Sequence, residues 1–158
     1  MLEIHKTVAK LYEDNKEYLE IFECLDEFSD TENFCNHYGF DIEDSCNAIL
    51  IKAKKPEEFY AMFCLLGANR LDVNHKAKEA MGAKRVSFAS RDEAELVTKQ
   101  IYGGISPLGL PENIKVFIDK NVIEREKLFI GAGNRVSKFF LSPETLIKLS
   151  NAEVLDLT

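Results

Sequence analysis

Gly103-Gly104-Ile105-Ser106-Pro107-Leu108-Gly109-Leu110-Pro111 is the stretch from which the organisation of this chain is best read. It holds three of the eight glycines and two of the four prolines. Neither a helix nor a central strand accommodates such a run, because proline lacks a backbone donor and glycine adopts dihedrals closed to other residues. The interleaved aliphatic residues make it too apolar for a solvated linker. We therefore expect a rigid loop pressed against either the core or a ligand, and composition leaves both alternatives open.

Helical and strand patterns alternate irregularly on both sides of this loop. Ser90 and Glu93 form a capping-box pattern, which predicts a helix that begins there and ends near residue 102, directly before the loop. Gly39 and Gly82 are expected to end two earlier helices. The predicted helices are 2–27 (as one or two pieces), 31–38, 72–81, 90–102 and a short one opened by Ser142-Pro143, and the predicted strands are 46–52, 59–66, 85–89, 115–119, 128–130, 135–141 and 153–157.

These elements are mostly not in the βαβ alternation of a parallel sheet, so the pattern predicts the α+β class. We expect residues 1–158 to form one domain with a mixed, largely antiparallel sheet, partly closed like a barrel and flanked by helices. Residues 1–39 are expected to form an acidic, helical N-terminal portion of that domain. The length of 158 residues suffices for one sizeable core.

Charge is distributed unevenly along the chain, which has a net charge of −7. Residues 1–45 contain three lysines against thirteen acidic residues, whereas residues 52–91 contain nine basic residues against four acidic ones. Such runs are usually solvated faces. A basic patch of this size is also sufficient to hold the end of a polyanion, although it is too small to wrap a long one.

The remaining composition indicates an intracellular, cytoplasmic protein. No apolar run reaches the length of a membrane span, and the N-terminus has neither a signal-peptide nor a transit-peptide pattern. Four cysteines occur without a CxxC pair, which favours reduced thiols.

Three kinds of site have weak support in the sequence. A cysteine hydrolase would pair Cys46 or Cys64 with His37 or His75, but no spacing brings them together, and buried structural cysteine is the more common fate. No pair of residues has metal-ligand spacing, so we expect no metal site. The GxG at 131–133 stands between two predicted strands, which favours a tight bend over a phosphate site at a helix start.

The glycine-proline loop remains the best candidate. If it is functional, its useful groups are backbone amides and carbonyls held at fixed angles, which can polarise an ester carbonyl or orient a water. Ser106 is the only hydroxyl in the loop, and a serine without an evident histidine partner is more often a structural hydrogen bonder than a nucleophile.

Several segments together resemble the YbaK/prolyl-tRNA synthetase editing-domain family. The segments that carry the resemblance occur in the family's order over roughly residues 40–158. They are Arg70-Leu71-Asp72, Lys84-Arg85-Val86 followed by Ala89-Ser90, the loop GGISPLGLP, Phe117-Ile118-Asp119 and Ile130-Gly131-Ala132-Gly133.

The resemblance implies a trans-acting editing enzyme that hydrolyses the ester joining a wrong amino acid to the 3′-terminal adenosine of tRNA, without a metal or other cofactor. It implies that the backbone of the loop cradles the aminoacyl ester, with Gly103 and Gly104 as catalytic positions. The residues implied to bind the substrate are Arg70, Ser90, Ser106, Pro107, Gly131, Gly133 and Asn134.

One position departs from the family pattern. Family members with established editing carry a lysine early in the first core strand, and Asn47 occupies that position here. Asparagine offers neutral hydrogen bonds in place of a charge. Lys52 lies five residues further on, so strand alternation places it on the opposite face.

The leading hypothesis is therefore an aminoacyl-tRNA deacylase in translation quality control, in which loop amides stabilise the oxyanion and Asn47 positions the terminal ribose or a water. The alternative is a non-catalytic module of the same fold that binds an aminoacyl-tRNA or nucleotide end. The expected partner is the acceptor end of tRNA, not a membrane, and a second copy of the chain and an aminoacyl-tRNA synthetase are further candidates.

Overall fold

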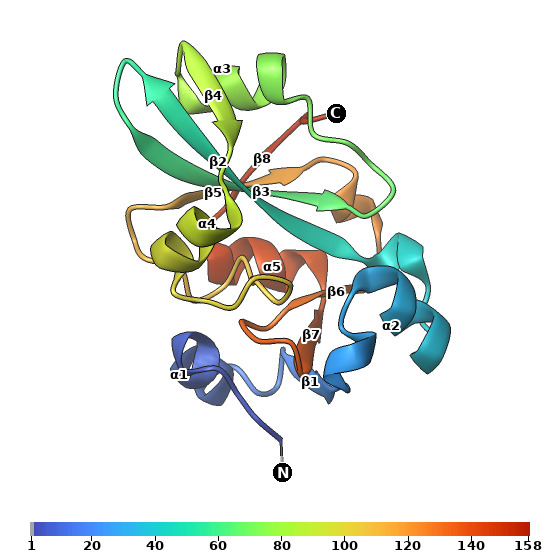
Figure 1. The fold of residues 1–158 in the computed structure, drawn as a ribbon. Coiled ribbons are helices and arrows are strands. Elements are labelled where there is room, and N and C mark those ends of the chain that lie inside the picture. The colour runs from blue at the N-terminus through green and yellow to red at the C-terminus, as the bar shows by residue number, and fades with distance from the viewer. Residues whose placement is uncertain (1) are drawn as a thin grey trace.

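The computed structural model describes residues 2–158 and contains two β-sheets (Figure 1). The larger sheet has five strands in the order β4-β2-β3-β5-β8. Its bounds are β2 Cys46–Lys55, β3 Phe59–Leu66, β4 Arg85–Phe88, β5 Lys115–Asp119 and β8 Glu153–Leu155. β2 pairs antiparallel with β3 and β4, while β5 runs parallel to both β3 and β8. The expected mixed and largely antiparallel arrangement is confirmed.

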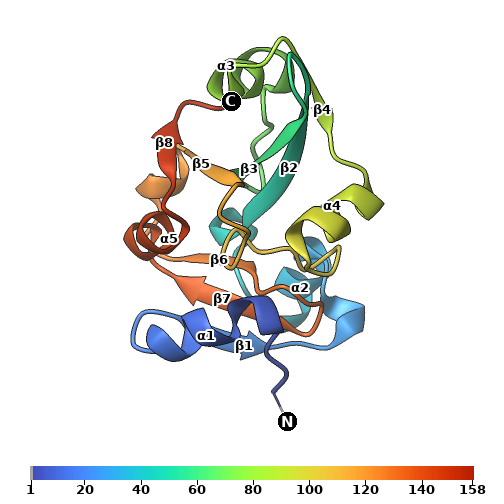
Figure 2. The ribbon, with the colours of Figure 1, turned by 90° about the vertical axis from the view of Figure 1, so that its left-hand side faces the viewer.

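The smaller sheet has three antiparallel strands in the order β1-β7-β6. They are β1 Glu20–Glu23, β6 Leu128–Gly131 and β7 Ser137–Leu141. Both views show this sheet below the larger one (Figures 1 and 2). The expectation of a partly closed barrel is wrong, because the strands divide between two open sheets. Within residues 2–158, one isolated backbone bridge, between Ser45 and Phe129, links the two sheets.

In the described part of the chain, five α-helices surround the sheets. They are α1 Lys6–Asp14, α2 Thr31–Tyr38, α3 Lys78–Met81, α4 Arg91–Thr98 and α5 Pro143–Ser150. A π-helical turn precedes α3, and three short 3₁₀ turns occupy loops. Local signals fixed most boundaries: Gly39 and Gly82 end α2 and α3 with positive φ, and the Ser90–Glu93 capping box is present. The fourth helix ends earlier than expected, because Lys99 takes the left-handed conformation directly after Thr98.

The N-terminal region differs most from the expectation. In place of a helix over 2–27, α1 ends at Asp14, and the chain then forms β1 and a 3₁₀ turn at Asp26–Phe28. Leu19 and Phe22, whose spacing from Val8 and Leu11 fits a helix, belong to this later part of the chain, where Phe22 pairs with Lys138 of β7. The acidic N-terminal portion is thus not purely helical, since it supplies a strand to the smaller sheet.

Three apolar clusters hold these layers together. The largest lies between the two sheets and collects residues of β2, β3, β5, β6, β7 and α5. A second covers the opposite face of the larger sheet under α3. The third is aromatic and packs α2 on the smaller sheet, with Phe34 at its centre. The start of β2, the end of β6 and the glycine-proline loop meet at the margin of these clusters.

Candidate functional site

The glycine-proline loop is fixed to the turn that follows β6 by backbone hydrogen bonds. The Gly133 amide donates to the Gly104 carbonyl at 2.7 Å, and the Ile101 amide donates to the Gly133 carbonyl at 2.9 Å. The approach is so close that a Cβ atom on Gly131 would lie 2.5 Å from the Ile105 carbonyl oxygen. Both segments therefore require glycine at their contact points.

A buried glutamine supports the loop from behind. Gln100 is 2% exposed; its Nε2 donates to the Leu108 carbonyl at 2.9 Å, and its Oε1 accepts from the Ser106 amide. The Ser106 hydroxyl accepts from the Leu108 amide at 3.1 Å. Ser106 is fully buried and acts inside the loop. Sequence reasoning missed Gln100, because a lone glutamine carries no pattern.

Beside the loop lies a pocket of about 300 Å³, which is within the lower range of small-molecule sites. Its lining comes from the loop before α2, the start of β2, the glycine-proline loop, the end of β6 and β7. The lining residues are Ser29, Asp30, Thr31, Cys46, Asn47, Ala48, Tyr102, Gly103, Gly104, Ile105, Gly131 and Lys138. Four of the predicted site residues therefore meet here, namely Asn47, Gly103, Gly104 and Gly131.

Two loop residues that line this pocket have backbone amides without a partner in residues 2–158. The Gly104 amide donates to the Ile101 carbonyl at 2.9 Å and so is engaged within the turn. No acceptor within residues 2–158 is found for the amides of its neighbours Gly103 and Ile105. The amides available to a ligand are thus those on either side of Gly104. Gly104 is itself a packing residue, because an added Cβ would overlap the carbonyl of Asn134.

Asn47 is exposed at the mouth of the pocket. Its Oδ1 accepts from the Ser45 hydroxyl at 3.3 Å, and we find no acceptor for its amide hydrogens in the described part of the chain. As strand alternation predicted, Lys52 faces elsewhere: its ammonium lies 2.9 Å from Glu93 and 3.3 Å from Glu58. Asn47 therefore keeps two free N–H donors beside the loop.

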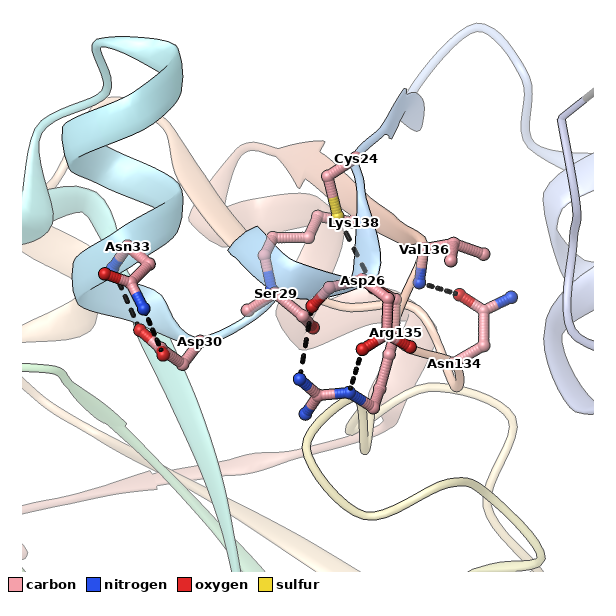
Figure 3. A network of polar contacts seen from close by, with 9 residues as sticks. All are labelled: Cys24, Asp26, Ser29, Asp30, Asn33, Asn134, Arg135, Val136 and Lys138. Carbon is pink, nitrogen blue, oxygen red and sulfur yellow. Dashed lines mark hydrogen bonds and ion pairs between the residues drawn. The ribbon is translucent and has the colours of Figure 1, made fainter.

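Lys138 is the cation of this pocket and was not predicted. It is 7% exposed and donates to the Ser29 carbonyl at 2.8 Å, and Figure 3 shows Lys138 beside Ser29. Its ammonium lies 5.0 Å from the centre of the Phe34 ring. Burial lowers the pKa of its ammonium. The signal that could have found it is a lysine within the apolar run from Val136 to Leu141.

The other predicted residues lie outside the pocket. Arg70 lines a separate hollow of about 520 Å³ with Ile49 and Phe88. Ser90 caps α4, and Pro107 is buried against a third hollow. Neither contributes to the lining around Gly103.

Gly133 and Asn134 stand behind the pocket. Gly133 has φ +95° and packs on His5. Asn134 is 3% exposed, and its Oδ1 accepts from the Val136 amide (Figure 3). The same oxygen accepts from the Ser137 hydroxyl. Both shape the turn that holds the loop.

The cysteines offer no activated nucleophile. All four are buried, and the hydrogen bond that the Cys64 thiol makes with Cys46, together with burial, raises the pKa of Cys64. His37 is stacked on Phe28 with ring centroids 3.7 Å apart. Within residues 2–158, no helix is long and apolar enough to cross a membrane.

The chain is thus an α+β domain in which the glycine-proline loop, Asn47 and the buried Lys138 line one small pocket. Residues 26–149 match the family model described as "Aminoacyl-tRNA editing domain", and the chain belongs to that family.

Relatives of known name support this assignment. The "Putative Cys-tRNA(Pro)/Cys-tRNA(Cys) deacylase EbsC" of Enterococcus faecalis is 28% identical over 92 residues, which are 58% of this chain and 56% of the relative. The proline–tRNA ligase of Nautilia profundicola is 32% identical over 106 residues, which are 66% of this chain and 18% of the ligase. The chain thus spans about half of the first relative and under a fifth of the second.

Solved structures show the same fold. One is described as a "putative trans-editing enzyme for prolyl tRNA synthetase", with a TM-score of 0.82, 19% identity and 99% of each chain covered. Another, the hypothetical protein APE2540, has a TM-score of 0.82 at 20% identity, and the match covers 96% of this chain and 99% of the other.

Proposed function

We propose that this chain is a trans-acting aminoacyl-tRNA deacylase, which hydrolyses the ester between an amino acid and the terminal ribose of tRNA. The observation that carries the proposal is the pair of unoccupied amides, Gly103 and Ile105, at a pocket of aminoacyl size. Family membership supports it, since the family is that of the aminoacyl-tRNA editing domain.

In the proposed reaction, water attacks the carbonyl carbon of the ester at the mouth of the pocket. The amides of Gly103 and Ile105 hold the oxyanion that develops, because backbone donors fixed in place stabilise such charge without reorganising. Asn47 orients the terminal ribose or the water. The bond from the acyl carbon to the ribose oxygen then breaks, and the ribose oxygen takes a proton from the water. The products are the free amino acid and tRNA with its terminal hydroxyl restored.

The positions of the basic residues support a path for the tRNA across the larger sheet. Lys54, Lys55, Lys84 and Arg85 are exposed at the end of β2 and β4 opposite Asn47, roughly 26 Å away at the usual rise per strand residue. The hollow of Arg70 and Phe88 lies on β2 and β4 between these two ends. We propose that the single-stranded acceptor end crosses this hollow, while the basic end of the sheet contacts duplex phosphates.

The test is ester loss from charged tRNAs incubated with the purified protein. The names of the relatives make cysteine on tRNA(Pro) and tRNA(Cys) the first substrates, followed by a panel of other mischarged tRNAs. We expect cleavage above the buffer rate, and Asn47→Ala should lower kcat/KM by roughly tenfold, the worth of one hydrogen bond in the transition state. Asn113→Ala is the matched control, because Asn113 is exposed outside the pocket.

A second candidate function is binding without hydrolysis, which the neutral Asn47 favours. In that case charged tRNA would bind at the same protein concentrations at which no ester is lost. Binding that Asn47→Ala weakens, without any cleavage by the native chain, would establish the binding module and reject the deacylase.

A further inference from the structure

The exposure of the lining residues gives the pocket a mouth and a floor. Asp30, Asn47, Tyr102 and Gly103 are exposed, whereas Ser29, Cys46, Gly104 and Lys138 are buried. A nucleotide is too large for about 300 Å³ together with an acyl group, so the terminal ribose stays at the mouth. On the proposed function, the side chain of the amino acid is then the part of the substrate that reaches the floor.

The floor carries the positive charge of Lys138, and no carboxylate in residues 2–158 forms an ion pair with it. The Lys138 ammonium has one hydrogen bond, to the neutral carbonyl of Ser29, and one aromatic face, that of Phe34. Asp30 is the nearest acidic residue on the lining, but Asn33 engages both of its oxygens, at 2.9 and 2.7 Å. An unpaired buried ammonium is costly to keep, so its retention indicates a ligand group that pairs with it.

The other charged groups nearby do not supply the missing anion. Arg135 is a second cation, held by Asp26 at 3.0 Å next to Gly103. The Cys24 thiol donates to the Arg135 carbonyl, and burial raises its pKa, so it stays neutral (Figure 3). The ammonium of Lys138 therefore retains donors for which residues 2–158 supply no acceptor.

Ser29 provides independent evidence that hydrogen-bond donors at the floor of the pocket are unused. It lines the pocket, is 1% exposed, and its hydroxyl is one of two buried side-chain oxygens or nitrogens in residues 2–158 without a hydrogen-bond partner. Buried hydroxyls in native proteins nearly always have a partner. A hydroxyl can turn about χ1 toward an incoming oxygen, so Ser29 and Lys138 together present unused donors at one place.

We propose that Lys138 and Ser29 form a polar subsite at the floor of the pocket, which selects aminoacyl esters whose short side chain ends in an oxygen acceptor, a carboxylate above all. The inference rests on the deacylase function proposed above. The carboxylate or hydroxyl oxygen of the acyl side chain receives hydrogen bonds from the ammonium and from the rotated serine hydroxyl. Apolar side chains of the same size leave both donors unpaired and are disfavoured.

The test uses pairs of aminoacyl esters of similar shape, in which the side chain of one member carries an oxygen atom. The pairs are threonine against valine, and aspartate or asparagine against leucine, each on the same tRNA. We expect kcat/KM to favour the oxygen-bearing member at least tenfold. Lys138→Met keeps an unbranched chain of similar length and should remove that preference while activity on valine is retained or raised. Lys148→Met, an exposed lysine of α5, is the control and should leave the preference unchanged.

Other outcomes overturn the proposal. A higher kcat/KM of the native chain for valine and leucine esters would do so. An equal loss of kcat/KM on both esters of a pair would also do so, if it occurs in Lys138→Met and in a second variant, Lys138→Gln, whose thermal unfolding is unchanged. The same pairs as esters of adenosine, which lack phosphate, separate the acyl group from the terminal phosphate as the partner of Lys138. A Lys138 effect present only with whole tRNA would assign the lysine to phosphate and reject the subsite.

Failure of the proposed deacylase function can be distinguished from failure of the subsite. If no ester is cleaved, the same pairs are measured as binding of non-hydrolysable 3′-amide analogues of adenosine. A Lys138-dependent preference for the oxygen-bearing analogue would then support the subsite without the deacylase, and its absence would reject the subsite as well.

Discussion

Gly104 lies so close to Asn134 that a Cβ atom on the glycine would overlap the carbonyl oxygen of the asparagine. The obstructing atom belongs to backbone, so a side-chain movement cannot relieve the overlap. The residue thus joins the loop that carries the free amides to the turn that supports it. Its role is to allow this contact, and its own amide is already engaged with Ile101.

Gly104→Ala should therefore destabilise the fold by about 1–3 kcal/mol or more, the usual cost of overpacking. Gly39→Ala is the control: φ there is +79°, but no atom lies within 4 Å of an added Cβ, so only backbone strain of about 1 kcal/mol applies. Denaturant unfolding of both variants measures the difference. Equal losses would show that the contact between Gly104 and Asn134 is not tight.

Ser106→Ala should lower stability and leave catalysis by the folded protein unchanged. The substitution leaves the buried Leu108 amide without its acceptor, at a cost of about 1–3 kcal/mol. Thermal unfolding measures the first effect, and kcat/KM at a temperature where the variant is folded measures the second. A stable variant without activity would instead identify Ser106 as a participant in the reaction.

Signals that act within a few residues were readable from the sequence. The Ser90–Glu93 box and Gly39 fix helix ends through their own neighbours, and the structure contains both. The predicted helix over 2–27 failed because Leu19 and Phe22 are compatible with either a helix or a strand. Pairing of Phe22 with Lys138, far along the chain, decides for the strand.

The candidate site divides in the same way. The glycine-proline loop is visible as a local run of glycine and proline, and two of its three glycines, Gly103 and Gly104, line the pocket. Ser29, Gln100 and Lys138 reach the site only through tertiary packing. Lys138 alone left a trace, as a charge within an apolar strand, whereas Ser29 and Gln100 have ordinary neighbours in the sequence.

Phe88→Ala should weaken tRNA binding if the acceptor end crosses the hollow that Phe88 shares with Arg70. Phe88 is 62% exposed, and stacking of one base on an exposed aromatic ring is worth about 1–3 kcal/mol. The dissociation constant should therefore rise roughly fivefold to a hundredfold. Tyr18→Ala is the control, because Tyr18 is 54% exposed beside a different hollow.

Arg70→Gln should act in the same hollow through charge. Loss of one phosphate contact reduces the slope of log affinity against log salt by about one, and it does so for any tRNA sequence. Binding isotherms at several salt concentrations measure the slope. Unchanged slopes would place the acceptor end elsewhere on the protein.

Glu93 links the pH dependence of stability to the loop. Its carboxylate lies 2.9 Å from the Lys52 ammonium and 2.8 Å from the Tyr60 hydroxyl, and it also accepts from the Ser90 amide. Chiefly through the hydrogen bond from Lys52, the pKa of Glu93 falls from its ordinary 4.5 to about 2. This anchor ties the start of α4 to β2 and β3, and the end of α4 leads into the glycine-proline loop.

The sign of the effect follows from proton binding. Between pH 4.5 and about 2, the unfolded chain holds a proton on Glu93 that the folded chain does not, so stability rises with pH across this window. The contribution is complete above pH 4.5 and is lost as the pH falls toward 2. Glu93 is partly exposed, so solvent screening keeps the effect modest.

Glu93→Gln should therefore unfold at a lower temperature than the native chain at pH 7, and its melting temperature should fall less steeply between pH 4.5 and 2. Glutamine keeps the size of the side chain but cannot pair with the Lys52 ammonium as a charge. Glu153→Gln is the control, because Glu153 pairs with Lys115 at the surface, far along the sheet from α4. If the melting temperature of Glu93→Gln falls with pH as steeply as that of the native chain between pH 4.5 and 2, another carboxylate governs the acid sensitivity. The proposed contribution of Glu93 to stability is then refuted.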